Sequence, residues 1–258
     1  MSIISCSTKP DFLIIGAQKC GTTSLFYYLS QHPDLNMPAI KEIHFFDLQY
    51  ERGIDWYYSF FPKKHLLKAK LTGEASPYYL FHPLVPERVF RYLPKIKIIV
   101  LLRNPVDRAY SHFMHQQKNI KNEPISDFEE AISLENTRIE LQEAKLISGV
   151  LSHSENLQSF SYISRGLYYK QINNWFKYFP RAQFHFIRSE DFFQNIETEL
   201  IQIYNFLEIS IKPANDLLPQ NTSYYPLLSQ PLRSKLHLYF ADDSKKLKSL
   251  IGEKFCWE

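Results

Sequence analysis

A short apolar segment that leads into a glycine-rich loop constrains the fold of this chain more than any other feature. Residues 12–15 read Phe-Leu-Ile-Ile, Gly16 follows, and Gly21 precedes the Thr-Thr-Ser of residues 22–24. This order predicts a buried strand, a tight turn and the first turn of an amphipathic helix. Because the first amides of a helix have no intrahelical acceptor and its dipole is positive there, the loop is suited to an anion such as phosphate.

The loop keeps the glycine spacing of a nucleoside-triphosphate loop but lacks its lysine. That loop reads G-x-x-x-x-G-K-S/T, and its lysine reaches the outer phosphates. Here Thr22 follows Gly21, and the lysine of the loop, Lys19, comes earlier. A lysine at that place suits a group attached to a single 5′-phosphate. A tight turn that binds nothing is the alternative for this segment taken alone.

A second block has the same strand-to-helix form. Residues 97–102, Lys-Ile-Ile-Val-Leu-Leu, are typical of a strand buried on both faces of a parallel sheet, and a proline suited to the start of a helix follows shortly after. Arg103 then lies at the carboxyl end of the strand, where open α/β sheets bind ligands. Its guanidinium and the hydroxyl of Ser111 suit a phosphate. The alternative is a surface ion-pair set of Arg103 and Arg108 with Asp107.

A third block reads Glu42-Ile-His44-Phe-Phe-Asp47. A carboxylate that aromatic side chains desolvate has a raised pKa and can act as a general base near neutral pH. His44 is the second candidate, because imidazole titrates in the useful range. The structural alternative places both groups as hydrogen-bonded polar residues at the rim of the core. Glu74 is a further candidate carboxylate in an acceptor cleft.

Taken together, the three blocks resemble the sulfotransferases that use 3′-phosphoadenosine 5′-phosphosulfate (PAPS), above all the heparan-type domains and their bacterial relatives. The resemblance covers residues 11–209, with a weaker tail to Trp257. It implies transfer of a sulfuryl group from PAPS to a hydroxyl, or an amine, of a carbohydrate, glycolipid or other small acceptor. The nucleotide product is then 3′-phosphoadenosine 5′-phosphate (PAP), and no metal is required.

The resemblance also implies roles for individual residues. Glu42 is the general base, with His44 as its substitute, and Lys19 neutralises charge on the leaving oxygen. The expected donor-binding residues are Lys19, Cys20, Gly21, Thr22, Thr23, Ser24, Arg103 and Ser111. Two features differ from the heparan-type members: Ala75 replaces a lysine, and the loop 221–226, expected to cover the adenosine, has no basic residue. Cys20 is either a reactive thiol beside a helix N-terminus or a small packing residue.

Alternating strand and helix patterns predict an α/β fold with one P-loop-type domain over residues 1–258. We expect a central, mostly parallel β-sheet with helices on both faces. Further helices are expected over 54–61, 86–93, 127–134, 166–179 and 196–207, and further strands over 71–74 and 183–187. Residues 1–10 are expected to be flexible, and 135–164 to form a variable acceptor-side region. The serine-rich run 149–161 is expected to be a flexible loop or lid.

Composition limits the possible functions. The formal net charge of +3 is too small to predict nucleic-acid binding by bulk charge. Three cysteines without metal spacing, and no long apolar run, predict a reduced cytoplasmic protein without a metal site or a membrane-spanning segment. Two rival functions stay open. One is a P-loop nucleotide kinase or NTPase, which requires ATP and magnesium, and the other is a nucleotide-binding protein without catalytic activity.

Overall fold

The computed structural model describes residues 9–62, 70–220 and 225–257. Five strands form one sheet in the order β2-β3-β1-β4-β5, and every neighbouring pair is parallel. The strands are β1 (Phe12–Gly16), β2 (Leu35–Asn36), β3 (Leu71–Ala75), β4 (Lys97–Leu102) and β5 (Phe184–Arg188). The predicted parallel α/β fold is therefore confirmed. The expectation of flexibility at the N-terminus concerns mainly residues 1–8, which lie outside the described residues.

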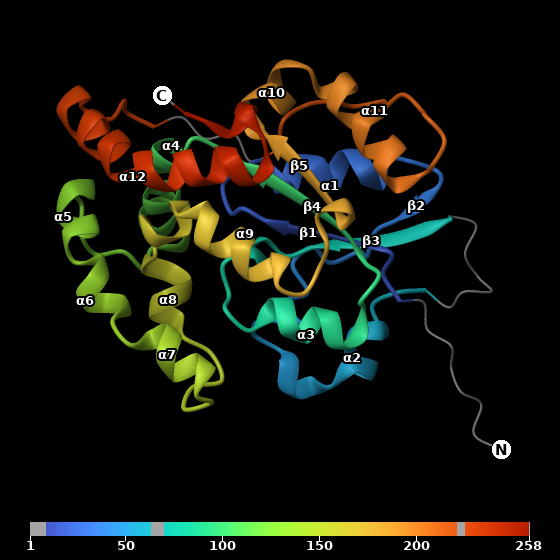
Figure 1. Ribbon diagram of the computed structural model, residues 1–258, viewed down its shortest axis with the longest axis horizontal. Helices are drawn as coiled ribbons and strands as arrows, with labels where there is room; N and C mark the ends of the chain where they lie inside the picture. The colour runs from blue at the N-terminus through green and yellow to red at the C-terminus, as the bar shows by residue number, and fades with distance from the viewer. Residues whose placement is uncertain (1–8, 63–69, 221–224, 258) are drawn as a thin grey trace.

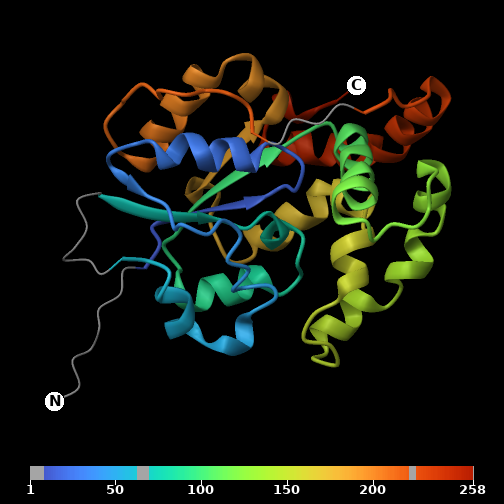
Figure 2. The same ribbon diagram turned by 180° about the vertical axis from the view of Figure 1, so that it is seen from behind.

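Helices cover both faces of the sheet. Those that follow the strands are α1 (Thr22–Ser30), α2 (Ile54–Tyr58), α3 (Val85–Tyr92), α4 (Pro105–His115), α9 (Tyr168–Phe176), α10 (Ser189–Gln194) and α11 (Ile196–Leu207). Figures 1 and 2 show α1, α10 and α11 on one side of the sheet and α2, α3 and α9 on the other. The chain builds the sheet outward from β1 to one edge, through β2 and β3, and then crosses back past β1 to add β4 and β5 at the other edge. Because the crossovers are right-handed, this reversal of direction puts helices on both faces.

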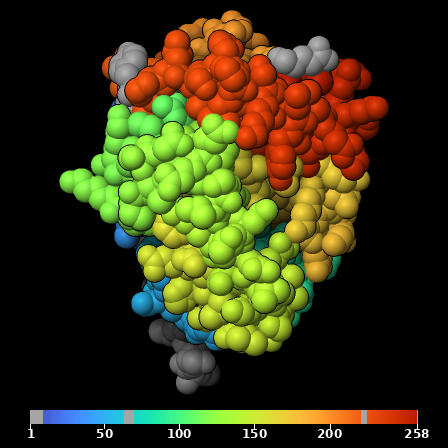
Figure 3. Space-filling view, turned by 90° about the vertical axis from the view of Figure 1, so that its left-hand side faces the viewer, coloured from blue at the N-terminus to red at the C-terminus, as the bar shows by residue number. Residues whose placement is uncertain are grey.

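A smaller group of helices lies beyond the carboxyl ends of the strands. It comprises α5 (Phe128–Ser133), α6 (Glu135–Ile139), α7 (Gln142–Ile147), α8 (Glu155–Phe160) and the long C-terminal α12 (Gln230–Ile251). Of these helices, α5, α8 and α12 share a second apolar core with α4 that includes Phe113, Phe128 and Phe240. Figure 3 shows that α5–α8, in green to yellow, and α12, in red, cover this side of the molecule.

The prediction of an irregular loop over 149–161 is wrong for its second half, which forms α8. Ser154 caps this helix, since its Oγ accepts a hydrogen bond from the amide of Leu157 at 3.1 Å. Ser161 Oγ donates to the Leu157 carbonyl at the other end. The serines that suggested a loop therefore mark the two ends of a short helix. No helix among the described residues is both long and apolar enough to span a bilayer.

Candidate functional site

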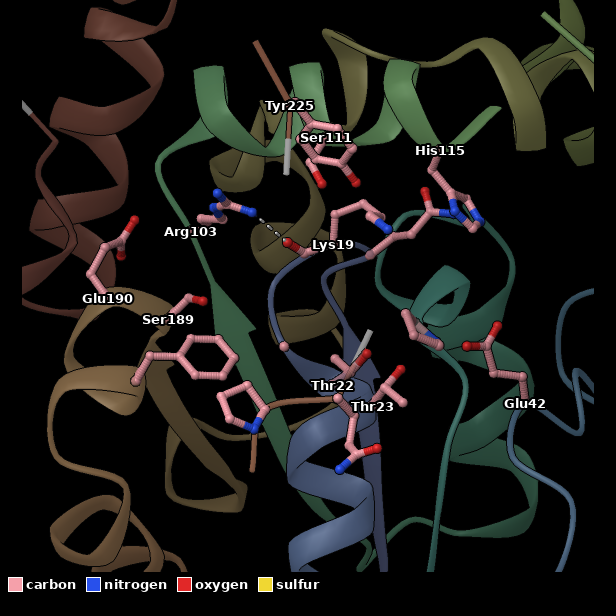
Figure 4. Close-up of a pocket in the computed structure, with 16 residues that line it drawn as sticks. Lys19, Thr22, Thr23, Glu42, Arg103, Ser111, His115, Ser189, Glu190 and Tyr225 are labelled. Atoms are coloured by element: carbon pink, nitrogen blue, oxygen red, sulfur yellow. Dashed lines mark hydrogen bonds between the residues drawn. The ribbon is translucent and has the colours of Figure 1, made fainter. Parts of the chain in front are cut away.

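A cavity of about 660 Å³ opens at the carboxyl ends of β1 and β4. Its position agrees with the general rule for ligand sites on open parallel sheets. The walls come from all three sequence blocks and from the segments after β5 and α11 (Figure 4). The lining residues are Gln18, Lys19, Gly21, Thr22, Thr23, Glu42, Pro77, Arg103, Ser111, His115, Ser189, Glu190, Phe193, Pro219, Gln220 and Tyr225.

The loop after β1 presents the start of α1 to this cavity. Gly21 is the N-cap with φ +93°, and the amide of Leu25 makes the first helical bond to its carbonyl at 3.0 Å. The positive φ favours glycine at residue 21, and a Cβ there would also lie 2.8 Å from the ring of Phe193. The amides of residues 22–24 precede the first intrahelical donor and are available to a ligand. The helix N-terminus is thus the most direct anion-binding element of the cavity.

Lys19 and Arg103 lie together on the wall next to this loop. The Arg103 guanidinium donates to the carbonyl oxygen of Lys19 at 3.3 Å (Figure 4). Burial lowers the pKa of Lys19, and the positive charge of Arg103 contributes to the same shift. Two cations are therefore held close together at the cavity wall, an arrangement that a bound polyanion would stabilise.

The segment after β4 is fixed by local hydrogen bonds. Asn104 caps α4, since its side chain accepts from the amide of Val106 at 2.9 Å. The hydroxyl of Tyr168 donates to the Arg103 carbonyl at 2.9 Å, so this tyrosine on α9 holds the backbone of Arg103 in place. Ser111, two turns into α4, lies on the same wall as Arg103. Residues of the first and second blocks therefore line the same cavity.

The surface ion-pair alternative for the second block is wrong. Asp107 pairs with Arg233 of α12 at 2.5 Å. Arg108 is fully buried and donates to the backbone carbonyl of Tyr162. Arg103 has no part in an ion pair with Asp107 and instead faces the cavity.

Glu42, His44 and Asp47 form a chain of hydrogen-bonded charges at the other end of the cavity. Glu42 Oε2 lies 3.3 Å from His44 Nε2, and Asp47 Oδ2 lies 2.8 Å from His44 Nδ1. Lys41 also contacts the Glu42 carboxylate. Glu42 and His44 both have positive φ angles, 64° and 55°, so this segment folds back on itself.

The sequence analysis predicted a raised pKa for Glu42, but these contacts lower it. Burial favours the protonated form, but the hydrogen bond from His44 and the charge of Lys41 outweigh it and lower the pKa of Glu42 to about 2. Burial likewise favours neutral His44, but Asp47 and Glu42 outweigh it and raise the pKa of His44 to about 10. His44 is therefore protonated at neutral pH and is not available as a proton acceptor. Glu42, whose side chain is 41% exposed, is ionised.

Glu74 is not a cleft residue, contrary to the prediction. It is fully buried at the end of β3, where it accepts from Tyr57 Oη at 2.9 Å and from Ser76 Oγ at 3.0 Å. Burial raises the pKa of Glu74 to about 7, although these hydrogen bonds act in the opposite direction. Ser76 Oγ in turn accepts from the amide of His44 at 3.2 Å. Glu74 therefore supports the Glu42–His44 segment from within the core.

Cys20 and Ser24, two of the eight predicted donor-binding residues, do not line the cavity. Cys20 is buried 3.9 Å from Tyr168 Oη, and burial raises the pKa of its thiol to about 11, so the reactive-thiol alternative is wrong. The Ser24 hydroxyl accepts from the amide of Gln220 at 2.9 Å. It ties the segment before residue 221 to α1. Of the predicted covering loop, residues 221–224 lie outside the described residues, and Tyr225 lines the cavity.

Several cavity residues were missed by the sequence analysis, notably His115, Glu190 and Phe193. His115 lies one helical turn after Ser111, so the four-residue spacing would have revealed it. Burial lowers the pKa of His115, and the charge of Lys19 adds to this effect. Glu190 accepts from the Asn104 amide at 2.8 Å, a long-range contact without a local sequence signal. Among the described residues, no group of three or more His, Cys, Asp or Glu side chains is placed to hold a metal ion.

Comparison with known proteins gives a consistent result. The profile described as "Sulfotransferase domain" matches residues 9–239. The chain is 29% identical over 96% of its length to the "Membrane-associated sulfotransferase kil1" of Dictyostelium discoideum, and spans 66% of that protein. It is 32% identical over 80% of its length to the human "Bifunctional heparan sulfate N-deacetylase/N-sulfotransferase 2", and spans 23% of it. A crystal structure of a sulfotransferase from Alicyclobacillus acidocaldarius superposes with a TM-score of 0.77 at 30% identity, covering 95% of this chain and 96% of that one.

Proposed function

The chain belongs to the sulfotransferase domain family, and from this membership we propose that it transfers the sulfuryl group of PAPS to a hydroxyl or amine of an acceptor, with Glu42 as the general base. The class of enzyme, a transferase of sulfur-containing groups, follows from the family itself. The donor, the base and the acceptor are the parts that we propose.

One observation carries the choice of donor: Lys19, Arg103 and the N-terminus of α1 meet at one cavity. A nucleotide with phosphates at both the 5′ and 3′ positions needs separate anion sites, because its phosphates lie on opposite sides of the ribose. The amides of α1 and Lys19 are suited to the 5′ end, and Arg103 with Ser111 to the 3′-phosphate. When bound, the donor supplies the sulfuryl group, and these residues fix its orientation.

Glu42 is the group that takes the proton from the attacking hydroxyl or amine of the acceptor, because its carboxylate is ionised and partly exposed at the cavity. His44, protonated between two carboxylates, holds Glu42 in place rather than accepting a proton. His115 is a second group able to accept a proton, because it lines the cavity from α4 and its pKa is lowered. Lys19 is placed to stabilise negative charge on the leaving oxygen.

We propose a carbohydrate or glycolipid acceptor, with other small hydroxyl compounds as the remaining class. The relatives named for heparan sulfate support a sugar acceptor, although this chain spans only 23% of that human protein. A cytoplasmic location stays a prediction from the cysteine content of the sequence and its lack of a long apolar run. The kinase alternative is disfavoured because Thr22 occupies the place of the phosphate-binding lysine.

The proposal is tested by incubating the protein with radiolabelled PAPS and a panel of glycans and glycolipids, and identifying labelled products by mass. Glu42→Gln is expected to bind PAP with an affinity within about threefold of wild type and to lose transfer by at least about a hundredfold. Glu51→Gln, which changes an exposed glutamate outside the cavity, is the matched control. Magnesium-dependent binding of ATP without binding of PAP would establish the kinase alternative instead. Equal transfer by wild type and Glu42→Gln would assign the proton to another group.

A further inference from the structure

Two arginine side chains are buried behind the wall of the cavity without a carboxylate partner. Arg108 has no exposed surface, and Arg165 is 3% exposed. Among the ion pairs formed by described residues, none includes either arginine. A buried charge without an opposite charge in direct contact is unfavourable, and buried charges in proteins are usually paired.

Arg108 lies on α4, one turn before Ser111, which lines the cavity. One end of its guanidinium donates to the carbonyl of Tyr162. Its Nε and Nη1 are buried and have no hydrogen-bond partner among the described residues. Donors in this state are rare in folded proteins, so Arg108 is not explained by its local hydrogen bonds.

Arg165 does not line the cavity but is hydrogen-bonded to a residue that does. Its Nη1 donates to Gln18 Oε1 at 2.5 Å, and Gln18 lines the cavity. Its Nη2 donates to the carbonyl of Gln158 at 2.6 Å, and the guanidinium lies 4.5 Å from the centre of the Tyr78 ring. All these hydrogen-bond partners are neutral, so Arg165 has no direct counter-ion, although the charges of Glu135 and Asp47 act on it from a distance.

The acidic groups near the two arginines are already engaged. Glu135 accepts from the amides of Ile163 and Ser164 at 2.6 and 2.8 Å and from Ser164 Oγ. Asp47 is bound to His44. The charges of Glu135 and Asp47 act on the arginines, but Asp47 is shared with protonated His44, and Lys19 and Arg103 add two more cations at the wall. Positive charge is therefore in excess around the cavity.

We propose that Arg108 and Arg165 are electrostatic binding residues for an anionic nucleotide, which they attract without touching. The charges of these arginines, balanced only in part by Glu135 and Asp47 in the free protein, are balanced further when a ligand with several phosphate charges enters the cavity. The inference rests on the proposed function, since PAPS and PAP are such ligands. In accord with it, burial lowers the pKa of buried His112, and both arginines contribute to that shift.

Two consequences distinguish this role from simple packing. First, the loss of affinity on removing a charge must grow with the charge of the ligand, because Coulomb energy scales with the product of charges. Second, removing a buried charge that has no direct counter-ion must not destabilise the free protein, because burial is the largest effect on both arginines and its cost disappears with the charge. A residue that only supports the fold has the opposite effects: equal losses for all ligands and a lower melting temperature.

The experiment compares wild type with Arg108→Met, Arg108→Lys and Arg165→Met by calorimetry with PAP and with adenosine 5′-phosphate. Each Met variant is expected to lose about tenfold in PAP affinity but only about threefold in adenosine 5′-phosphate affinity, while Arg108→Lys stays within about threefold for both. The melting temperature of free Arg108→Met is expected to equal or exceed that of wild type. Arg91→Met, at a surface position that is 61% exposed, is the matched control.

The inference is overturned if the Met variants lose affinity equally for both nucleotides, or if Arg108→Lys loses as much as Arg108→Met. It is also overturned if Arg108→Met does not fold, because the arginine would then be a structural residue. Failure of the proposed function looks different: wild type itself would not bind PAP. Tight PAP binding by wild type with unchanged binding by the variants would refute only the role of the two arginines.

Discussion

Replacing the buried carboxyl group of Glu74 is expected to make the protein more resistant to alkaline pH. Glu74 has no exposed surface and no cation beside it, and its partners are the hydroxyls of Tyr57 and Ser76. Its pKa is about 7 in the folded protein against 4.5 for the ordinary group. Glutamine has nearly the same shape and retains an oxygen for Tyr57, but it cannot ionise.

The sign and size of the effect follow from proton linkage. Between pH 4.5 and 7 the folded protein keeps the proton of Glu74 while the unfolded chain has released it, so the free energy of unfolding falls as pH rises through this window. With these two pKa values, the loss between pH 5 and pH 8 is about 2.5 kcal/mol. The same loss cannot occur in Glu74→Gln. Other titrating groups affect both proteins alike and cancel in the comparison.

The assay is urea unfolding of wild type and Glu74→Gln at pH 5 and pH 8, with Glu51→Gln as an exposed control. Wild type and the control are expected to lose about 2.5 kcal/mol more than Glu74→Gln on going to pH 8. Parallel losses in all three proteins would show that Glu74 titrates normally in the folded state. Its burial would then be relieved by water or by a change in the Tyr57 and Ser76 contacts, and the support that it gives to the Glu42–His44 segment would need another explanation.

Three further predictions concern the cavity and the loop. Arg103→Ala is expected to reduce PAP affinity by about a hundredfold and adenosine 5′-phosphate affinity by less than about threefold, measured by calorimetry; equal losses would remove its 3′-phosphate role. Burial lowers the pKa of His115, so the kcat/KM of wild type is expected to fall as the pH drops below neutrality. His115→Gln is expected to lack this fall. The same fall in the variant would show that another group causes it. Iodoacetamide at pH 7 is expected to alkylate Cys20 in urea but not in the folded protein. With a pKa of about 11, only about one Cys20 side chain in ten thousand is a thiolate at pH 7. Labelling of Cys20 in the folded protein would contradict this prediction.

Local patterns in the sequence were sufficient for the elements that carry the cavity. The helix predicted over 196–207 has those bounds as α11, and α4 begins at the predicted Pro105. Both are amphipathic, and α4 also has a clear start signal in Asn104 and Pro105. The strands that border the cavity are buried on both faces, which is why their sequences are continuously apolar. The family itself was identified from the motifs at the ends of these strands.

Properties that depend on contacts between distant residues were not predictable in this way. The aromatic residues next to Glu42 suggested a desolvated base with a raised pKa. In the fold, Phe45 and Phe46 pack into the core against Tyr57, while the backbone of Glu42 turns its carboxylate toward Lys41 and His44. The nearest charges, rather than the nearest apolar residues in sequence, therefore determine the ionisation of Glu42.

A carboxylate with a pKa of about 2 is a weak base, and the charge balance of the cavity offers a reason why it can still serve. In the free protein the hydrogen bond from His44 and the charge of Lys41 lower the pKa of Glu42. A bound nucleotide brings several negative charges to the same cavity, and like charges raise the pKa of a carboxyl group. Glu42 is thus expected to gain proton affinity when the donor is present. An NMR titration of the Glu42 side-chain carboxyl carbon, whose signal is identified by its loss in Glu42→Gln, is then expected to give a higher pKa with PAP bound than without it. The same pKa in both states would contradict this coupling.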